Sequence, residues 1–222
     1  MLVTKIVKVA TATLFALALA CGTLLAQNRA SDFFTVSHSP SVTPFTDSNN
    51  ATVTLYSNLG PTTTNEYYDT NGYCVTGNNQ STCGTSEQWI ATPFTPAKAS
   101  HATQIQVALQ YFSGTNEFQV SLYNDVGGAP GTSLKTVEGK NAPTAGTCCT
   151  LVNVSLGTPG VSLTAATQYW VVVSADDTHA PTFSAYWAFT NFANVAYNPA
   201  QAGWTTFQDN GAEAAAVKGT VP

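Results

Sequence analysis

Apolar and polar residues alternate along much of this chain, and the alternation predicts β-strands. The clearest example is Thr103–Tyr111, in which every second side chain is apolar and glutamines fill three of the positions between them. Successive side chains of a strand point to opposite faces of a sheet, so this segment is predicted to be one half-buried strand. A second alternating segment covers residues 118–123, and the short link Ser113–Asn116 predicts a hairpin between the two. Its polar side consists of Gln119, Ser121 and Tyr123.

The remaining apolar runs are short and end at turn residues, which favours strands over helices. The glycine-rich segment Asn124–Gly131 is predicted to be a turn. Further strands are predicted at Val53–Ser57, Gln88–Phe94, Leu134–Val137, Thr150–Leu156, Gln168–Ala175, Thr182–Thr190 and Ala214–Thr220. No segment between them has the period of an amphipathic helix. The predicted fold class is therefore all-β, an antiparallel β-sandwich with a jelly-roll or related Greek-key topology.

The first 26 residues are predicted to be a secretory signal peptide. Two lysines precede the apolar run Val9–Ala20, which is shorter than the about 20 residues that a membrane-spanning helix needs. Cleavage could follow Ala20 or Ala26, and the second is preferred because it removes Cys21 and leaves an even number of cysteines. Alternatively, Cys21 is the acylated first residue of a lipoprotein, although Ala18 stands where such signals prefer leucine.

After cleavage, residues 27–51 are predicted to form a flexible leader, because they are rich in Ser, Thr, Pro and Asn and lack sustained periodicity. Residues 52–222 are predicted to form a single β-sandwich domain with no transmembrane segment. The mature chain has five basic residues against 12 acidic ones, a net charge of −7. This charge argues against nucleic acid or an anionic membrane as partner.

Several short motifs resemble, in order and spacing, the choice-of-anchor R type domain of bacterial secreted proteins, over about residues 52–220. They are Leu55–Gly60, Phe94–Pro96, Val120–Asp125, Gly128–Gly131, and Leu163 with Tyr169–Val172. The resemblance implies a β-sandwich displayed outside the cell, and it brings no established activity or catalytic residue. Such domains are typically followed by a surface-sorting tail that opens with Val-Pro-Glu-Pro. The sequence stops at Val221-Pro222, so a released protein and a truncated sequence both stay open.

The common catalytic signatures for zinc, serine, nucleotide and redox chemistry are missing, so no catalytic residue, cofactor or metal is predicted. Asp176 and Asp177 could place a carboxylate near His179 for general-base work, but His179 and His101 are both expected in loops, without a marked nucleophile. Asp125 or the Asp176-Asp177 pair could bind Ca²⁺, although a turn-capping role is the simpler interpretation. A glycoside hydrolase needs only two suitably spaced carboxylates, and no sequence spacing selects a pair.

Four cysteines remain after the predicted cleavage, as expected in an oxidising compartment. The segment between Cys74 and Cys83 is polar, so a disulfide is predicted to close it, worth roughly 2.5 to 3 kcal/mol in the chain-entropy model. Cys148 and Cys149 are adjacent, and their Cα separation of about 3.8 Å is below the usual disulfide range. Three alternatives stay open for this pair: a strained vicinal disulfide, two thiols, or cross-pairing with Cys74 and Cys83. The preferred connectivity joins Cys74 to Cys83 and Cys148 to Cys149. A redox switch at the vicinal pair is a secondary hypothesis.

Aromatic residues provide the only hint of binding. In Thr182–Thr190 the alternation places Tyr186 on one face and Trp187 on the other, with Phe183, Ala185 and Phe189. Trp170 is expected in the core, and Trp187 is expected there too unless its ring meets a ligand. The ring candidates for binding a sugar are Trp204, Tyr186, Trp187, Tyr67 and Tyr68. The leading hypothesis is a secreted, non-enzymatic β-sandwich that binds a glycan or surface component. The alternatives are a self-associating matrix protein and a glycan-active hydrolase, and the oligomeric state stays open.

Overall fold

A computed structural model describes residues 51–60, 67, 71–80, 87–147, 150–190, 193–199, 202–209 and 211–222. All of them belong to the larger of two units into which the chain divides, Val36–Pro222. The predicted signal peptide and, apart from Ala51, the predicted leader lie outside the described residues. The described part of the chain contains no helix long and apolar enough to cross a membrane.

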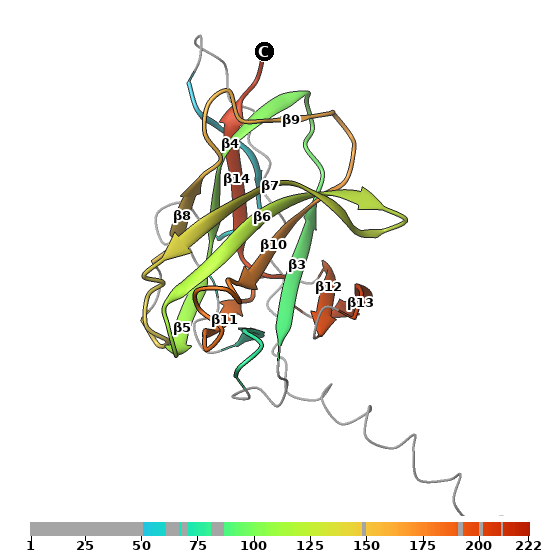
Figure 1. The fold of residues 1–222 in the computed structure, drawn as a ribbon. Helices are drawn as coiled ribbons and strands as arrows, with labels where there is room; N and C mark the ends of the chain where they lie inside the picture. The colour runs from blue at the N-terminus through green and yellow to red at the C-terminus, as the bar shows by residue number, and fades with distance from the viewer. Residues whose placement is uncertain are drawn as a thin grey trace, which may run out of the picture. The chain divides into compact units, whose positions relative to one another are not determined.

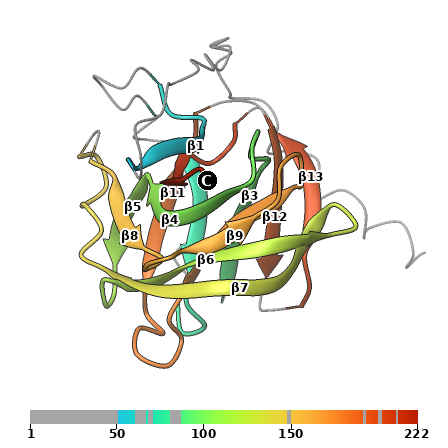
Figure 2. The ribbon, with the colours of Figure 1, turned by 90° about the horizontal axis from the view of Figure 1, so that it is seen from above.

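Within the described residues, fourteen strands form two antiparallel sheets that pack against each other, which confirms the predicted β-sandwich (Figures 1 and 2). The five-stranded sheet has the order β1 (Val53–Ser57), β14 (Ala215–Thr220), β4 (Ser100–Val107) and β8 (Val152–Ser155), and β9 (Val161–Leu163) also pairs with β4. The nine-stranded sheet has the order β5 (Leu109–Ser113), β11 (Ser184–Ala188), β2 (Gly72–Thr76), β3 (Gln88–Phe94), β10 (Tyr169–Ala175), β6 (Glu117–Val126) and β7 (Ala129–Lys140). Beside this path, β12 (Ala193–Pro199) pairs with β3, and β13 (Thr205–Asp209) pairs with β12.

The main core lies between the two sheets and is built from alternate residues of their strands. On β6 the inward residues are Phe118, Val120 and Leu122, all fully buried. On the opposing sheet Ile105 of β4 and Val217 of β14 are also fully buried. Full burial of such a side chain stabilises the fold by roughly 1.5 to 3 kcal/mol, so the two-residue period of the sequence is what holds the sandwich together.

The predicted single strand Thr103–Tyr111 is divided between the sheets, so that prediction is wrong. Residues up to Val107 pair with β14 and β8, whereas residues from Leu109 pair with β11. Ala108 forms the corner, where its N–H donates to Ala214 O at 3.1 Å and its carbonyl accepts from Ala188 N at 2.9 Å. Because apolar side chains face the same core on both sides of the corner, the alternation runs through it unbroken.

Gln110 also differs from the expectation that its side chain faces solvent. It is fully buried, and its Oε1 accepts a hydrogen bond from Gly146 N at 2.9 Å. The segment after β7 covers this edge of the sheet, with Tyr111 N donating to Pro143 O at 2.7 Å and Ala145 N donating to Tyr111 O at 2.8 Å. A polar residue on the outer side of a strand is therefore buried by a distant part of the chain.

The predicted hairpin across Ser113–Asn116 is also wrong. β5 pairs with β11, whereas β6 pairs with β7 and β10. The hairpin partner of β6 is β7, and the turn between them is only Gly127-Gly128, with φ values of 65° and 83°. Positive φ at both turn positions is the signature of a tight two-residue hairpin, which glycine adopts without strain. Most of the predicted turn Asn124–Gly131 is therefore strand.

Candidate functional site

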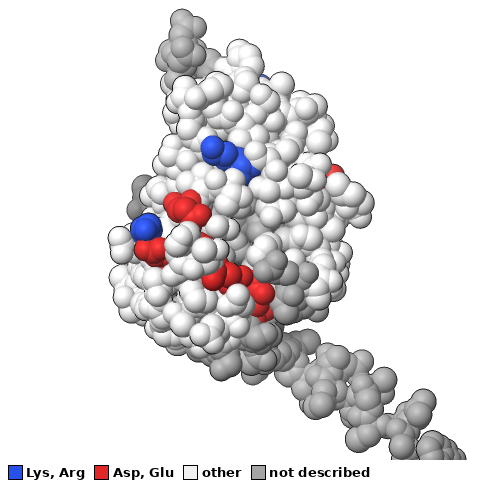
Figure 3. All heavy atoms as spheres, viewed as in Figure 1, with Lys and Arg blue, Asp and Glu red and all other residues white. Residues whose placement is uncertain are grey.

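The outer face of the nine-stranded sheet is the face turned away from the other sheet, and it carries the candidate site. Because Phe118, Val120 and Leu122 of β6 point into the core, the residues between them point outward. The same rule applies to β10, where Val171 and Val173 are in the core. In Figure 3 charged atoms form a few small groups on an otherwise uncharged surface.

Trp170 is almost fully buried, at 1% exposure, but it lies outside the main core. It packs with Ala91, Val172 and Ala196 in a separate cluster, and Tyr123 and Trp204 pack against that cluster. The expectation that Trp170 is buried is confirmed, although what buries it is this outer-face cluster and not the opposite sheet. Trp170 thus supports two aromatic rings.

Asp125 holds this arrangement together at the end of β6. Its Oδ1 accepts hydrogen bonds from Trp170 Nε1 at 2.8 Å and Gln168 Nε2 at 2.7 Å, and its Oδ2 accepts from Gly128 N at 3.1 Å. Partial burial raises the pKa of Asp125, but the three hydrogen bonds outweigh this effect and hold the pKa below its usual value. The carboxylate therefore stays ionised and links the indole to the β6–β7 turn.

Tyr123 and Trp204 are partly exposed above Trp170. Their rings meet edge to face, with centroids 6.3 Å apart and an interplanar angle of 75°. Trp204 immediately precedes β13, and the turn before it is fixed by a hydrogen bond from Gly203 N to Asn198 Oδ1 at 2.9 Å. We define the aromatic site as Tyr123, Trp204, Trp170 and Asp125.

A pocket of about 240 Å³ lies next to the aromatic site and is lined by Gly128, Thr206, Phe207 and Gln208. Thr206 pairs with Ala196, a member of the Trp170 cluster. Side chains directly opposite each other in an antiparallel pair share a face, so Thr206 lies on the same face as that cluster. The pocket is therefore bounded by the β6–β7 turn and by β13.

Uncharged hydroxyl groups follow the aromatic site along β6 and β7. The hydroxyls of Ser121 and Thr136 lie 2.8 Å apart, and those of Ser133 and Thr136 lie 3.0 Å apart. Ser121 is buried, whereas Ser133 and Thr136 are exposed. A hydroxyl can both donate and accept a hydrogen bond, so the two exposed ones can adapt to a neutral polar ligand.

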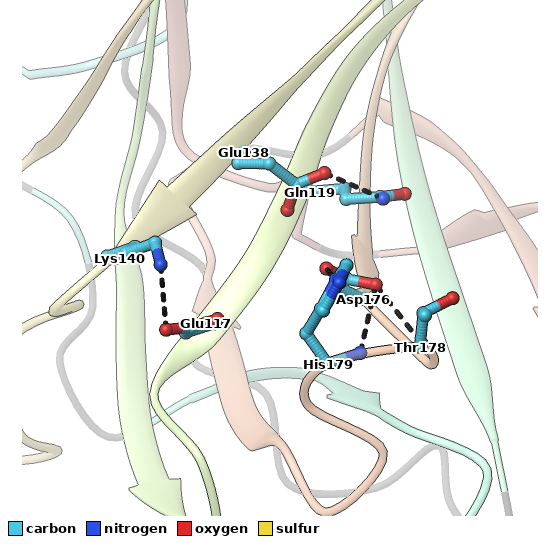
Figure 4. Close-up of polar contacts among 7 residues, drawn as sticks. All are labelled: Glu117, Gln119, Glu138, Lys140, Asp176, Thr178 and His179. Carbon is cyan, nitrogen blue, oxygen red and sulfur yellow. Dashed lines mark hydrogen bonds and ion pairs between the residues drawn. The ribbon is translucent and has the colours of Figure 1, made fainter.

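Charged residues lie further along the same strands, in what we call the charged row (Figure 4). Lys140 Nζ donates to Glu117 Oε1 at 2.8 Å, and Gln119 Nε2 donates to Glu138 Oε1 at 2.9 Å. The contact with Glu117 raises the pKa of Lys140. The ammonium group therefore stays protonated, and both pairs are open to solvent.

Asp176 and His179 form a carboxylate–imidazole pair beside the charged row. His179 Nδ1 lies 2.5 Å from Asp176 Oδ2, and Asp176 Oδ1 accepts from the backbone N–H groups of Thr178 and His179 at 3.1 and 3.3 Å. Burial raises the pKa of Asp176, but its hydrogen bonds with His179 and Thr178 lower it overall, and the contact with Asp176 raises the pKa of His179. Among the described residues, no hydroxyl or thiol is hydrogen-bonded to the imidazole. The pair therefore offers an oriented, exposed proton donor without an adjacent nucleophile.

At the two sites considered for Ca²⁺, the carboxylates accept hydrogen bonds from other parts of the protein. Asp125 holds Trp170 and the turn, and Asp177 Oδ1 accepts from Asn78 N at 3.0 Å. Within the described ranges, no three His, Cys, Asp or Glu side chains are grouped so that they could hold a metal ion. His101 lies in β4 and not in a loop as predicted, and its Nδ1 is 3.2 Å from the Ser162 hydroxyl.

The other predicted ring candidates do not gather at the aromatic site. Tyr186 is partly exposed on β11 and meets Phe112 edge to face at 4.7 Å, but β2 and β3 separate β11 from β10. Trp187 is fully buried and its Nε1 donates to Ala214 O at 2.9 Å, so the expectation that it presents a ring to a ligand is wrong. Tyr67 is only 8% exposed, with its hydroxyl donating to Thr150 O at 3.1 Å, so its expected exposure is wrong as well. Tyr68 lies outside the described residues.

Only one of the predicted disulfide cysteines is described. Cys74 lies on β2, in register with Tyr186, and is 9% exposed. Cys83, Cys148 and Cys149 lie outside the described residues, so the pairings stay predictions. Peptide mapping of unreduced protein should recover a fragment linking Cys74 and Cys83, and a fragment linking Cys74 to Cys148 or Cys149 would contradict the preferred pairing.

Tyr123 and Asp125 are the members of the site that sequence reasoning missed. Tyr123 is an aromatic residue on the otherwise polar side of β6, and this was the available signal. The turn-capping role considered for Asp125 is confirmed by its bond from Gly128 N, but its link to Gln168 and Trp170 was missed, because these partners are more than 40 residues away in sequence.

No protein-family model matches this chain, and comparison with curated proteins yields no significant match. The resemblance to choice-of-anchor R type domains therefore stays a prediction.

Proposed function

We propose that this protein is a secreted, non-enzymatic β-sandwich that binds a neutral glycan at the aromatic site. The observation that carries the proposal is the pair of partly exposed rings, Tyr123 and Trp204, held above a buried indole. The apolar faces of sugar rings stack on aromatic side chains, and neighbouring polar groups supply orientation through hydrogen bonds. Ser133 and Thr136 are exposed groups of this kind.

The support beneath the rings favours binding because it limits the entropy lost on association. Trp170 is packed on its sides by Val172 and Ala91 and is hydrogen-bonded to Asp125. A ligand that meets rings already held in place loses less free energy to side-chain ordering than one that must order them. The aromatic site is therefore suited to weak, shape-dependent recognition of a sugar surface.

The distribution of charge favours a neutral ligand. Glu117 of the charged row is six residues from Tyr123 along β6, which separates their Cα atoms by roughly 20 Å in an extended strand. Lys135, the nearer charged residue of β7, pairs with the inward-facing Leu122. The nearest charged group of the aromatic site itself, Asp125, is engaged by three hydrogen bonds. The acidic character of the whole chain further disfavours polyanions.

The predicted signal peptide supports a location outside the cell, where structural and surface glycans are found. Cleavage after Ala26 is the expected processing step, and the intact mass of extracellular protein measures it. A product that begins at an acylated Cys21 would instead identify a lipoprotein.

The test of the proposed function is a binding assay with immobilised cellulose, xylan, mannan, β-1,3-glucan and their hexasaccharides. Trp204→Ala should weaken binding of the recognised glycan roughly tenfold, the equivalent of about 1.4 kcal/mol. The matched control is Phe112→Ala, which removes a 46% exposed ring elsewhere on the outer face and should leave binding unchanged. Equal losses in both variants, or no binding by the wild type, would refute the proposal, and release of reducing sugar would identify a hydrolase.

A further inference from the structure

The pocket beside the aromatic site is small and partly open to solvent. Its volume of about 240 Å³ is below the roughly 300 to 1,000 Å³ that sites for drug-sized ligands occupy. It therefore has room for one compact group, such as a single sugar ring, and not for several units of a chain.

Two segments of the chain connect the aromatic site to the pocket, one at β13 and one at the β6–β7 turn. Thr206 lies two residues after Trp204, a distance of roughly 7 Å between Cα atoms in extended chain. On the other side Gly128 follows Asp125, which fixes the β6–β7 turn by accepting from Gly128 N. A ligand resting on Tyr123 and Trp204 thus reaches the pocket directly, and the hairpin turn lies at the boundary of that pocket.

The lining of the pocket matches a neutral, hydroxylated group. Thr206 provides a hydroxyl and Gln208 provides an amide, so both can donate and accept hydrogen bonds. Phe207 and Gly128 add apolar and backbone surface, and none of the four residues is charged.

We infer that the site recognises the end of a neutral glycan chain, with the terminal sugar unit in the pocket and the adjacent unit on Tyr123 and Trp204. This inference rests on the proposed function, because it assigns a specific part of the glycan to a site next to the aromatic one. A terminal unit has one free side to set between the β6–β7 turn and β13, whereas an internal unit must continue in both directions.

Filling the pocket is the direct test. Thr206→Phe places a ring in the pocket and should weaken binding of the recognised hexasaccharide at least tenfold. Thr205→Phe is the matched control, since Thr205 is also exposed on β13 but is absent from the pocket lining, and this variant should bind as the wild type does. Thermal melting of both variants separates a blocked pocket from a damaged fold.

A comparison of chain lengths provides the second measurement. The probes are the recognised polysaccharide, one of cellulose, xylan, mannan and β-1,3-glucan, and its hexasaccharide. At equal mass the hexasaccharide has many more chain ends, so it should compete roughly tenfold better for wild-type protein. Equal competition by mass, or unchanged binding by Thr206→Phe, would overturn end recognition while leaving glycan binding intact. Unchanged binding by Trp204→Ala would instead refute the proposed function itself.

Discussion

The aromatic site and the charged row both include residues of β6, yet they are built in opposite ways. In the aromatic site the exposed rings rest on Trp170, which is 1% exposed and hydrogen-bonded to Asp125. In the charged row the ion pair between Lys140 and Glu117 joins side chains that are 59% and 30% exposed, so both partners reach into solvent.

This difference separates a preorganised surface from a solvated one. A ring fixed by packing offers a ligand a contact area that is already in place. In an exposed ion pair the two charges already bind each other, and salt and water screen them. The outer face therefore has a packed part and a solvated part, and the register of β6 with β7 is regular along the charged row but shifts at Tyr123 and Asp125. The following predictions test that contrast, beginning with the largest expected effect.

Trp170→Ala should lower the free energy of unfolding by about 3 to 5 kcal/mol, because it leaves a cavity under Tyr123 and Trp204. Denaturation in urea, monitored by circular dichroism, measures this loss. Phe112→Ala is the control, since it removes an exposed ring and should change stability far less. A small loss in Trp170→Ala would mean that the layer beneath the rings is not firmly packed.

Asp125→Ala should destabilise the protein by roughly 1 to 3 kcal/mol, because it leaves the buried Trp170 Nε1 without its acceptor. Asp125→Asn keeps an acceptor oxygen and should lose less. Since the pKa of Asp125 is lowered in the fold, its ionic contribution is present above the unfolded pKa of about 3.9 and is lost as pH falls through the folded value. Melting of wild type and Asp125→Asn should therefore converge at low pH, and a constant gap would contradict this account.

His179→Gln should flatten the dependence of stability on pH without a large change at alkaline pH. The folded pKa of His179 is raised, so its stabilising effect is full below the unfolded pKa of about 6.5 and disappears as pH rises through the folded value. Asp176 faces it directly, and Glu138 and Glu117 also raise its pKa. Thermal melts at pH 5.5 and 8.5 measure the effect, with His101→Gln as control. A larger deficit at pH 8.5 than at pH 5.5 would reverse the expected sign.

Glu117→Gln should have the smallest effect, with a melting temperature close to that of the wild type and unchanged glycan binding. The ion pair that it breaks is exposed and already shielded by water. If this variant loses binding as Trp204→Ala does, the ligand extends over the charged row and the division of the outer face is wrong.

The boundaries of several strands were predictable from the chain alone, because they depend on local alternation. β1 and β3 begin and end as predicted, and β10 and β14 differ from their predictions by one residue each. β2, β9, β12 and β13 were not predicted. β12 has only Val195 and Tyr197 as large apolar residues and β13 has only Phe207, so their alternation is weak, and they are held by pairing with β3 and with each other.

Strand pairing was the first property that local sequence could not provide. The period of two continues from Ile105 through Leu109, because both residues face the same core, while the backbone between them changes sheets. Sheet partners are often distant in sequence, as β5 and β11 are. The entropy cost of closing a loop grows only slowly with its length, so this cost does not force a strand to pair with the next strand along the chain.

The sequence by itself determined that this protein is an antiparallel sandwich with an uncharged, polar exterior and that Trp170 is buried. Only the tertiary structure decided that Trp170 is covered by Trp204 on the outer face, that Trp187 belongs to the core, and that Tyr123 completes the site. The physical reason is that alternation specifies which side chains share a face, whereas exposure of a ring depends on which remote segment packs over it.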